Sequence, residues 1–197
     1  EYAIRVETPG GAYHIGGMCK GSGMIEPLMA TMLGCVTTDA AVDPVLLRRA
    51  LDHGVRAVVA HCASMGQDRD LDQGENGPYV DSFDLFARLM DDPVYGPKLN
   101  GDISAMTQLN RAGPVLEAVL AREDWHARLH NGSDYPLPGV MPLFSVTYMV
   151  QLGLIPETAV PVLTEIRKHN PLLFDFVLKR HLAFKGKRFA KSVFETR

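Results

Sequence analysis

The glycine-rich run from His14 to Asp43 contains the first residues whose types and spacing suit catalysis. It holds Lys20 in Lys-Gly-Ser-Gly-Met and Thr31 in Ala-Thr-Met-Leu. A threonine hydroxyl becomes a nucleophile when a nearby base takes its proton, and glycines beside it allow the tight backbone that a reacting centre needs. The structural alternative is an ordinary glycine loop with a buried threonine.

Polar residues at the ends of three short apolar runs form the second candidate. VRAVVAH ends at His61, KLNGD ends at Asp102 and HARLHNGSD ends at Asp134. If the runs are neighbouring parallel strands about 4.8 Å apart, these residues lie at one sheet edge, within roughly 15 Å of each other. Imidazole and carboxylate groups suit a divalent metal. A core histidine at His61 and an Asx turn at Asp134 are the structural alternatives.

Composition narrows the class of protein. The 197 residues are 46% hydrophobic and 22% charged, with a net charge of −3. Such a chain is typical of a globular protein with one good core, and it favours neither nucleic acid nor a membrane as partner. The three cysteines form no CxxC pair, which favours a reducing compartment. We therefore expect a cytoplasmic protein with a small-molecule substrate.

The elements that would position these residues alternate from residue 44 onward. Apolar periodicity and turn signals predict helices over 44–53, 83–90 and 114–124, strands over 55–61, 98–105 and 126–134, and a polar loop over 67–79. Three further helices follow over 141–152, 158–169 and 171–183, the last capped by Asn170. The 55–61 run is nearly all apolar, which predicts a strand buried on both faces. Short strands near 2–6, 13–15 and 32–36 are expected before a boundary at residues 42–47.

The first run resembles the cleavage region of the ornithine acetyltransferase/glutamate N-acetyltransferase family over about residues 13–43. The resemblance implies that the precursor breaks between Ala30 and Thr31, that Thr31 takes the acetyl group, and that Lys20 lies in the substrate site. The new α-amino group of Thr31, with a pKa of about 7.7–8.0, would be the base. It implies no cofactor. The family's upstream half and its Ser-Thr-Asn-Asp stretch have no counterpart here, so we expect Ala30–Thr31 to stay intact in this chain.

The later runs, VVAHCASMG, LNGDISAM and HNGSDYPLPG, resemble the last strands of the amidohydrolase superfamily over about residues 45–197. The resemblance implies a metal-dependent hydrolase with Asp134 and His61 as catalytic residues and metal ligands, zinc or manganese as the metal, and Asp102 as a weaker candidate. The His-x-His pair of that family is absent, so one imidazole and one carboxylate would not fill the usual ligand shell.

The expectation is thus an α/β chain: a partial TIM-type (β/α) barrel over residues 44–197, preceded by a short β/loop segment over 1–43. The first interpretation of the chain's function is a metal-dependent hydrolase that acts on a small organic substrate. The alternatives are acetyl transfer from acetylornithine to glutamate by Thr31, and an inactive fusion fragment. Open sheet edges predict a protein partner, either a second copy of the chain or a missing complementary half.

Overall fold

A computed structural model describes residues 2–8, 11–20, 33–38, 48–49, 51–74 and 76–195 of the chain. The chain divides into two compact units, Glu1–Leu47 and Arg48–Arg197.

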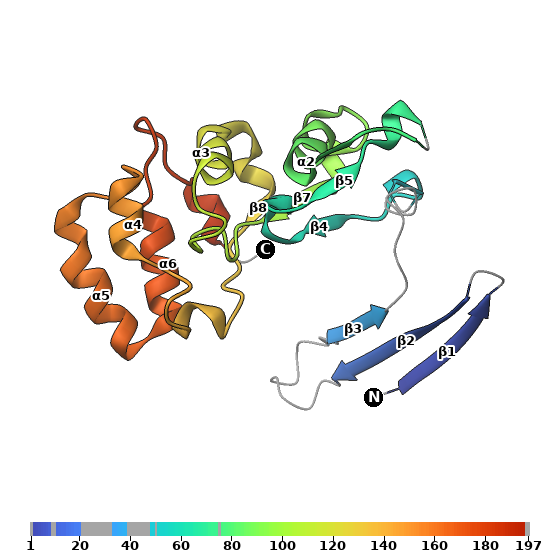
Figure 1. Cartoon of the computed structure of the whole chain (residues 1–197), viewed down its shortest axis with the longest axis horizontal. Helices are drawn as coiled ribbons and strands as arrows, with labels where there is room; N and C mark the ends of the chain where they lie inside the picture. Colours follow the sequence, from blue (N-terminus) through green and yellow to red (C-terminus); the bar gives the residue numbers. More distant parts are fainter. Residues whose placement is uncertain are drawn as a thin grey trace. The chain divides into compact units, whose positions relative to one another are not determined.

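The first unit contains an antiparallel sheet with the strand order β1-β2-β3 (Figure 1). Its strands are β1 (Tyr2–Thr8), β2 (Gly11–Lys20) and β3 (Leu33–Thr38). All three predicted strands are found, but β2 is much longer than residues 13–15. Gly16 and Gly17 weaken the strand propensity of this segment. Both residues nevertheless pair with β1 on one side and with β3 on the other, and this pairing outweighs their low propensity.

The second unit is built around a three-stranded parallel sheet with the order β4-β7-β8. In chain order its regular elements are β4 (Ala57–Val59), β5 (Gln67–Arg69), β6 (Tyr79–Asp81), α2 (Ser82–Asp91), β7 (Leu99–Asp102), α3 (Pro114–Ala121), β8 (Leu129–His130), α4 (Val146–Gln151), α5 (Val160–His169) and α6 (Pro171–His181). Short 3-10 turns join several of them, including η1 (Ala60–Ala63), η4 (Glu123–Arg128), η5 (Leu137–Gly139) and η7 (Lys191–Phe194).

The register of the strands shows that the sheet is parallel. Val59 lies opposite Gly101, and Asp102 lies opposite His130. The helices α2 and α3 come between the strands in sequence, as parallel crossovers require. The described residues form no closed barrel, and the interpretation as part of a (β/α) barrel stays a prediction.

Strand β4 does not match its expected burial. Val58, at its centre, is 58% exposed, and Val55 just before it is 52% exposed. The strand is an edge strand that pairs only with β7 among the described residues. The prediction from a nearly all-apolar run was therefore wrong, because β4 lies at the edge of the sheet.

The region predicted as a polar loop over 67–79 contains a small antiparallel sheet instead. Strands β5 and β6 pair, with Asp68 opposite Val80. Asp70 is buried between them and α2, and its carboxylate pairs with Arg88 at 3.0 Å. This segment is polar, so hydrophobic periodicity does not reveal its ordered structure.

The core lies between the sheet and its helices, and continues into the helices after β8. Leu99 and Leu129 of the sheet are buried, and Phe86 of α2 meets Trp125 edge-on, with ring centroids 5.8 Å apart. Among the later helices, Phe174 of α6 packs against Phe144 at 6.5 Å. The Asn170 cap is confirmed, since its side chain accepts a hydrogen bond from the Leu173 amide at 2.9 Å.

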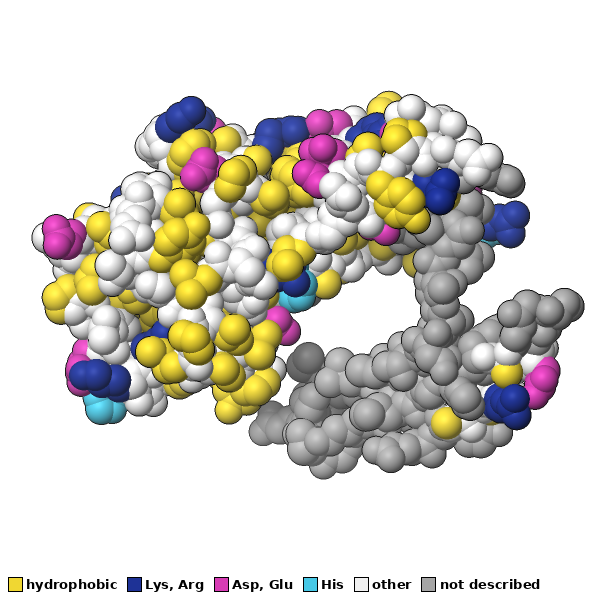
Figure 2. Space-filling view, viewed as in Figure 1, with side chains coloured by type: hydrophobic (Ala, Val, Ile, Leu, Met, Phe, Trp, Pro, Cys, Tyr) yellow, Lys and Arg dark blue, Asp and Glu magenta, His cyan; other side chains and the backbone are white. Residues whose placement is uncertain are grey.

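Large apolar side chains are also exposed on the second unit. Tyr135 and Met141, which flank η5, are 66% and 71% exposed, and Leu172 of α6 is 46% exposed. Figure 2 shows apolar side chains gathered on this face of the unit, with charged groups scattered around them. No helix among the described residues is long and apolar enough to cross a membrane.

Candidate functional site

The structure brings His61, Asp102 and Asp134 together at one edge of the parallel sheet. His61 follows β4, Asp102 ends β7, and Asp134 lies four residues beyond the end of β8. The two imidazole nitrogens face different carboxylates: Nδ1 lies 3.9 Å from Asp102 Oδ1, and Nε2 lies 3.9 Å from Asp134 Oδ2. The parallel order of the strands produces this grouping, because the carboxyl ends of all three meet at the same edge.

Ser104 fixes the orientation of His61. Nδ1 lies 3.0 Å from the Ser104 carbonyl oxygen and 2.7 Å from its Oγ. These two contacts hold Nδ1 toward Ser104 and turn Nε2 toward Asp134. Asp102 in turn accepts a hydrogen bond from the Ser104 amide at 2.6 Å. Sequence reasoning missed Ser104, although its place two residues after Asp102 is a usual Asx-turn spacing.

Left-handed backbone conformations concentrate at this edge. His61, Cys62 and Ala63 have φ of 55°, 49° and 51°, while Ala105 and Asp134 have φ of 55° and 54°. Non-glycine residues adopt such values at a cost, and they cluster where the surrounding structure holds a side chain in a particular direction. Here they turn the chain sharply after each strand and aim His61 and Asp134 at each other.

A buried ion pair supports the loop that carries Asp134. Lys179 and Asp175, one turn apart on α6, are each 1% exposed, and Lys179 Nζ lies 2.7 Å from Asp175 Oδ2. The same ammonium donates to the Gly132 carbonyl oxygen at 2.7 Å. Burial lowers the pKa of Lys179, against the opposing effect of Asp175. Burial likewise raises the pKa of Asp175, against the effect of Lys179.

Neighbouring groups offer little further chemistry at this edge. Cys62 is fully buried, its Sγ donates to the Asp102 carbonyl oxygen at 3.2 Å, and burial raises the pKa of its thiol. Over the part of the chain that the structure describes, no group of three or more His, Cys, Asp or Glu side chains is arranged to hold a metal ion. The roles of His61 and Asp134 as metal ligands therefore stay predictions.

In the first unit, the structure places Lys20 but not Thr31. Lys20 is the last residue of β2 and pairs with Leu33, the first residue of β3. Thr31 and Ala30 lie outside the described residues, within the stretch 21–32 that joins these two strands. The sheet thus positions both ends of the segment that carries the predicted nucleophile.

Comparison with known proteins concerns this part of the chain. Residues 1–62 match the model of the ArgJ family. The arginine biosynthesis bifunctional protein ArgJ of Symbiobacterium thermophilum is 65% identical over 49 residues, which are 25% of this chain and 12% of that protein. The ArgJ protein of Thermosynechococcus vestitus is 48% identical over 62 residues, 29% of this chain and 15% of its own length. The mitochondrial ArgJ protein of Neosartorya fischeri is 52% identical over 48 residues, 24% of this chain and 10% of that protein. No solved structure matches the chain.

These findings correct the first interpretation of the sequence. The chain was expected to be a metal-dependent hydrolase, but the matching family and the curated relatives are ArgJ proteins, and nothing found supports an amidohydrolase. The expectation rested on a resemblance of short motifs at strand ends to amidohydrolase strands. Polar residues at the ends of parallel strands occur in many α/β folds, so such motifs do not specify a reaction.

The extent of the match also differs from the expected one. It begins at residue 1 and reaches residue 62, well beyond the predicted stretch 13–43. It therefore includes β4 and His61, which belong structurally to the second unit. The chain spans about 12% of the length of the Symbiobacterium relative. Residues 1–62 are thus similar to ArgJ proteins, and residues 63–197 lie outside that similarity.

Proposed function

We propose that residues 1–62 supply the nucleophile-bearing segment of an acetyltransferase of arginine biosynthesis. The observation that carries the proposal is the match of these residues to the ArgJ family, which includes Lys-Gly-Ser-Gly-Met and Ala-Thr-Met-Leu. In this proposal Thr31 is the nucleophile and Lys20 lies in the substrate site. The proposed substrates are N-acetylornithine as acetyl donor and glutamate as acceptor.

The proposed chemistry needs only the residues of a nucleophilic site. When the upstream half of the family is supplied, as in a chimera, the Ala30–Thr31 bond breaks. The α-amino group of Thr31 then accepts the proton of its own hydroxyl, directly or through a water molecule. Thr31 Oγ then attacks the acetyl carbonyl carbon, and the amine of ornithine leaves with a proton. The α-amino group of glutamate attacks the resulting ester and restores the free hydroxyl. No metal or redox cofactor is needed for any of these steps.

The pairing of Lys20 with Leu33 supports this assignment. Antiparallel partners lie about 5 Å apart between their Cα atoms, so the end of β2 lies beside the start of β3. Thr31 precedes Leu33 by only two residues in the sequence. Lys20 therefore lies beside Leu33, which follows Thr31 by two residues in the sequence.

A chimera tests the proposal. The segment of the Thermosynechococcus vestitus relative that matches this chain is replaced by residues 1–62 of this chain. We expect the chimera to break before Thr31 and to transfer acetyl groups from N-acetylornithine to glutamate. Thr31→Ala should abolish both events, whereas Thr8→Ala, at the end of β1, should abolish neither. A chimera that folds but neither breaks nor transfers acetyl groups would refute the proposal.

A further inference from the structure

The second unit contains three Asn-Gly steps, Asn76-Gly77, Asn100-Gly101 and Asn131-Gly132. Such a step can modify itself, because glycine has no Cβ atom that would keep its nitrogen away from the asparagine side chain. The reaction needs an accessible asparagine and a backbone that can bring the glycine nitrogen onto the side-chain carbon. These two requirements separate the three steps.

The sheet holds two of the steps in place. Asn100-Gly101 lies in β7, which pairs with β4 on one side and with β8 on the other. The last step follows β8 directly: the Asn131 amide donates to the Val193 carbonyl oxygen at 2.9 Å, and the Gly132 carbonyl oxygen accepts from the buried Lys179 at 2.7 Å. Either glycine nitrogen can reach its neighbour only when contacts of the core open, which is a rare event.

The remaining step, Asn76-Gly77, lies in the loop that joins β5 to β6. Asn76 is exposed, and so are Gly74 and Pro78 on either side of it. The Gly77 amide donates to the Gly74 carbonyl oxygen at 2.9 Å, which holds the nitrogen in a turn. Opening this turn breaks that bond and no strand pairing, so it requires less free energy than opening β7 or β8.

We propose that Asn76 deamidates spontaneously and that its isoaspartyl product loosens the hairpin formed by β5 and β6. The Gly77 nitrogen loses its proton to hydroxide and attacks Asn76 Cγ. The bond from Cγ to Nδ2 breaks, and Nδ2 takes up a proton and leaves as ammonia. Water then opens the cyclic imide. Cleavage at Cγ gives an aspartate, and cleavage at the main-chain carbonyl carbon gives an isoaspartate. No atom is oxidised or reduced, and the site is independent of the acetyl transfer proposed for Thr31.

The isoaspartyl product inserts one additional carbon atom into the main chain just before Gly77, where the packing is tight. A Cβ atom at Gly77 would lie 1.9 Å from the Asp70 carbonyl oxygen, so the two backbones are already in contact. The next residue, Pro78, accepts a hydrogen bond from the Asp70 amide at 2.8 Å. Displacement of this stretch breaks that bond and moves Asp70, whose carboxylate pairs with Arg88. The loop end of the hairpin should therefore loosen.

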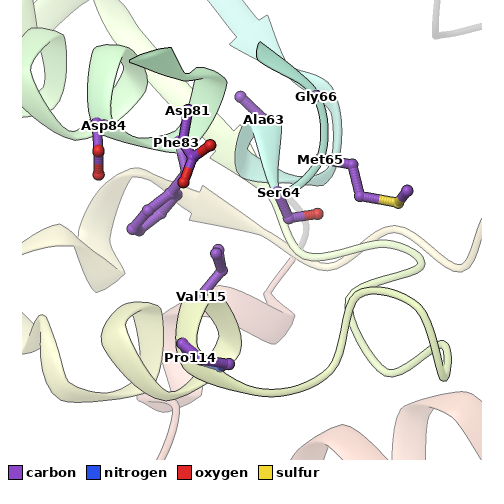
Figure 3. Close-up of a pocket in the computed structure, with 9 residues that line it drawn as sticks. All are labelled: Ala63, Ser64, Met65, Gly66, Asp81, Phe83, Asp84, Pro114 and Val115. Carbon is purple, nitrogen blue, oxygen red and sulfur yellow. The ribbon is translucent and has the colours of Figure 1, made fainter.

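The other end of the hairpin is held by separate contacts. The Ser82 amide donates to the Gly66 carbonyl oxygen at 3.1 Å, and the Gln67 side chain donates to Asp81 Oδ1 at 3.2 Å. Figure 3 shows Gly66 and Asp81 at this end, where they line a cavity together with Phe83 of α2. These contacts do not involve the loop that carries Asn76, so the Ser82 amide is an internal reference for the Asp70 amide.

Peptide mapping of the whole chain, incubated at mildly alkaline pH both folded and in urea, tests the reaction. In the folded chain we expect Asn76 to deamidate at least about tenfold faster than Asn100 and Asn131. In urea the three rates should become similar, because no strand then restrains the glycine nitrogens. Asn76→Gln, whose longer side chain disfavours the cyclic imide, should stay unmodified at this position. Equal rates at the three steps of the folded chain, or no reaction at Asn76, would overturn the proposal.

Hydrogen exchange followed by NMR tests the structural consequence. In the isoaspartyl chain the Asp70 amide should exchange at least about tenfold faster than in the unmodified chain, while the Ser82 amide stays unchanged. Freshly prepared Asn76→Asp is the matched control, because it adds the negative charge without the additional carbon atom, and it should exchange like the unmodified chain at both amides. An Asp70 amide that is unaffected by isoaspartate, or is exposed equally by Asn76→Asp, would refute the loosening by insertion.

Discussion

Lys20 and Leu33 are direct partners in the antiparallel pair of β2 and β3. Their pairing brings together the two strand ends that flank the segment with Ala30–Thr31 in the sequence. The match to ArgJ proteins covers this whole region. The acetyltransferase proposal rests on this match.

The close packing beneath the sheet edge predicts that Gly101→Ala destabilises the second unit. A Cβ atom at this position would lie 2.8 Å from Cys62 Sγ and 2.9 Å from Phe86 Cζ, closer than atoms normally approach. Overpacking of this kind costs about 1–3 kcal/mol in the free energy of unfolding. Urea unfolding followed by the fluorescence of Trp125 measures the loss, because the chain has only 1 tryptophan.

The control for this variant is Val58→Ala on the neighbouring strand. Val58 is 58% exposed, so its truncation should change the free energy of unfolding by only about 0.5 kcal/mol. If Gly101→Ala is as stable as Val58→Ala, the packing of Cys62 and Phe86 against β7 is not as described.

The buried pair on α6 predicts a large effect when one partner is removed. Lys179→Met leaves the buried carboxylate of Asp175 without its cation, which should cost about 3–5 kcal/mol in the free energy of unfolding. The double variant with Asp175→Leu should recover most of the loss, because it leaves no unpaired charge. Chemical denaturation of the two variants provides the comparison.

An exposed pair of similar spacing is the matched control. Lys168 pairs with Glu165 at 2.8 Å on α5, and both side chains are more than half exposed, at 64% and 59%. Lys168→Met should therefore cost less than about 1 kcal/mol. A loss for Lys179→Met no greater than this would show that the α6 pair is not a buried support of the Asp134 loop.

The ion pair of Asp70 predicts a dependence of stability on acid pH. The hydrogen bond from Arg88 holds the pKa of Asp70 below its ordinary value of 3.8. A depressed pKa in the folded state means that the unfolded chain binds the proton more readily, so stability rises with pH in that window. The contribution is complete above 3.8 and is lost as the pH falls through the folded pKa.

Removing either partner should reduce this acid sensitivity. The slope of unfolding free energy against pH below pH 4 should be smaller in Asp70→Asn and in Arg88→Gln than in the parent chain. Unfolding curves measured at several acid pH values provide the slopes. Parent-like slopes in both variants would show that this pair does not couple folding to protonation.

The sequence predicted the meeting of His61, Asp102 and Asp134 correctly, because parallel strands that end in polar residues must bring those residues to one edge. It did not predict Ser104, whose contact with His61 depends on the turn after β7. The β5/β6 sheet was also missed, because its polar sequence carries no apolar periodicity.

The chemistry was harder to predict than the geometry. The hydrolase interpretation rested on the resemblance of VVAHCASMG, LNGDISAM and HNGSDYPLPG to the last strands of the amidohydrolase superfamily. Strand ends show where polar groups gather, but they do not say which reaction occurs there. The Lys-Gly-Ser-Gly-Met and Ala-Thr-Met-Leu spacing proved more specific, and the family match supports it. The motifs around Thr31 therefore predicted the function better than the polar residues at the strand ends, which many folds share.

The central claim is that Thr31 is the residue that takes the acetyl group. Its most direct test is to incubate the Thermosynechococcus chimera with N-acetylornithine, without glutamate, and to map the modified peptide by mass spectrometry. We expect one acetyl group on Thr31 Oγ in a chain that begins at Thr31, and its disappearance when glutamate is added. An active chimera whose Thr31 never carries an acetyl group, or that keeps its activity as Thr31→Ala, would contradict the account.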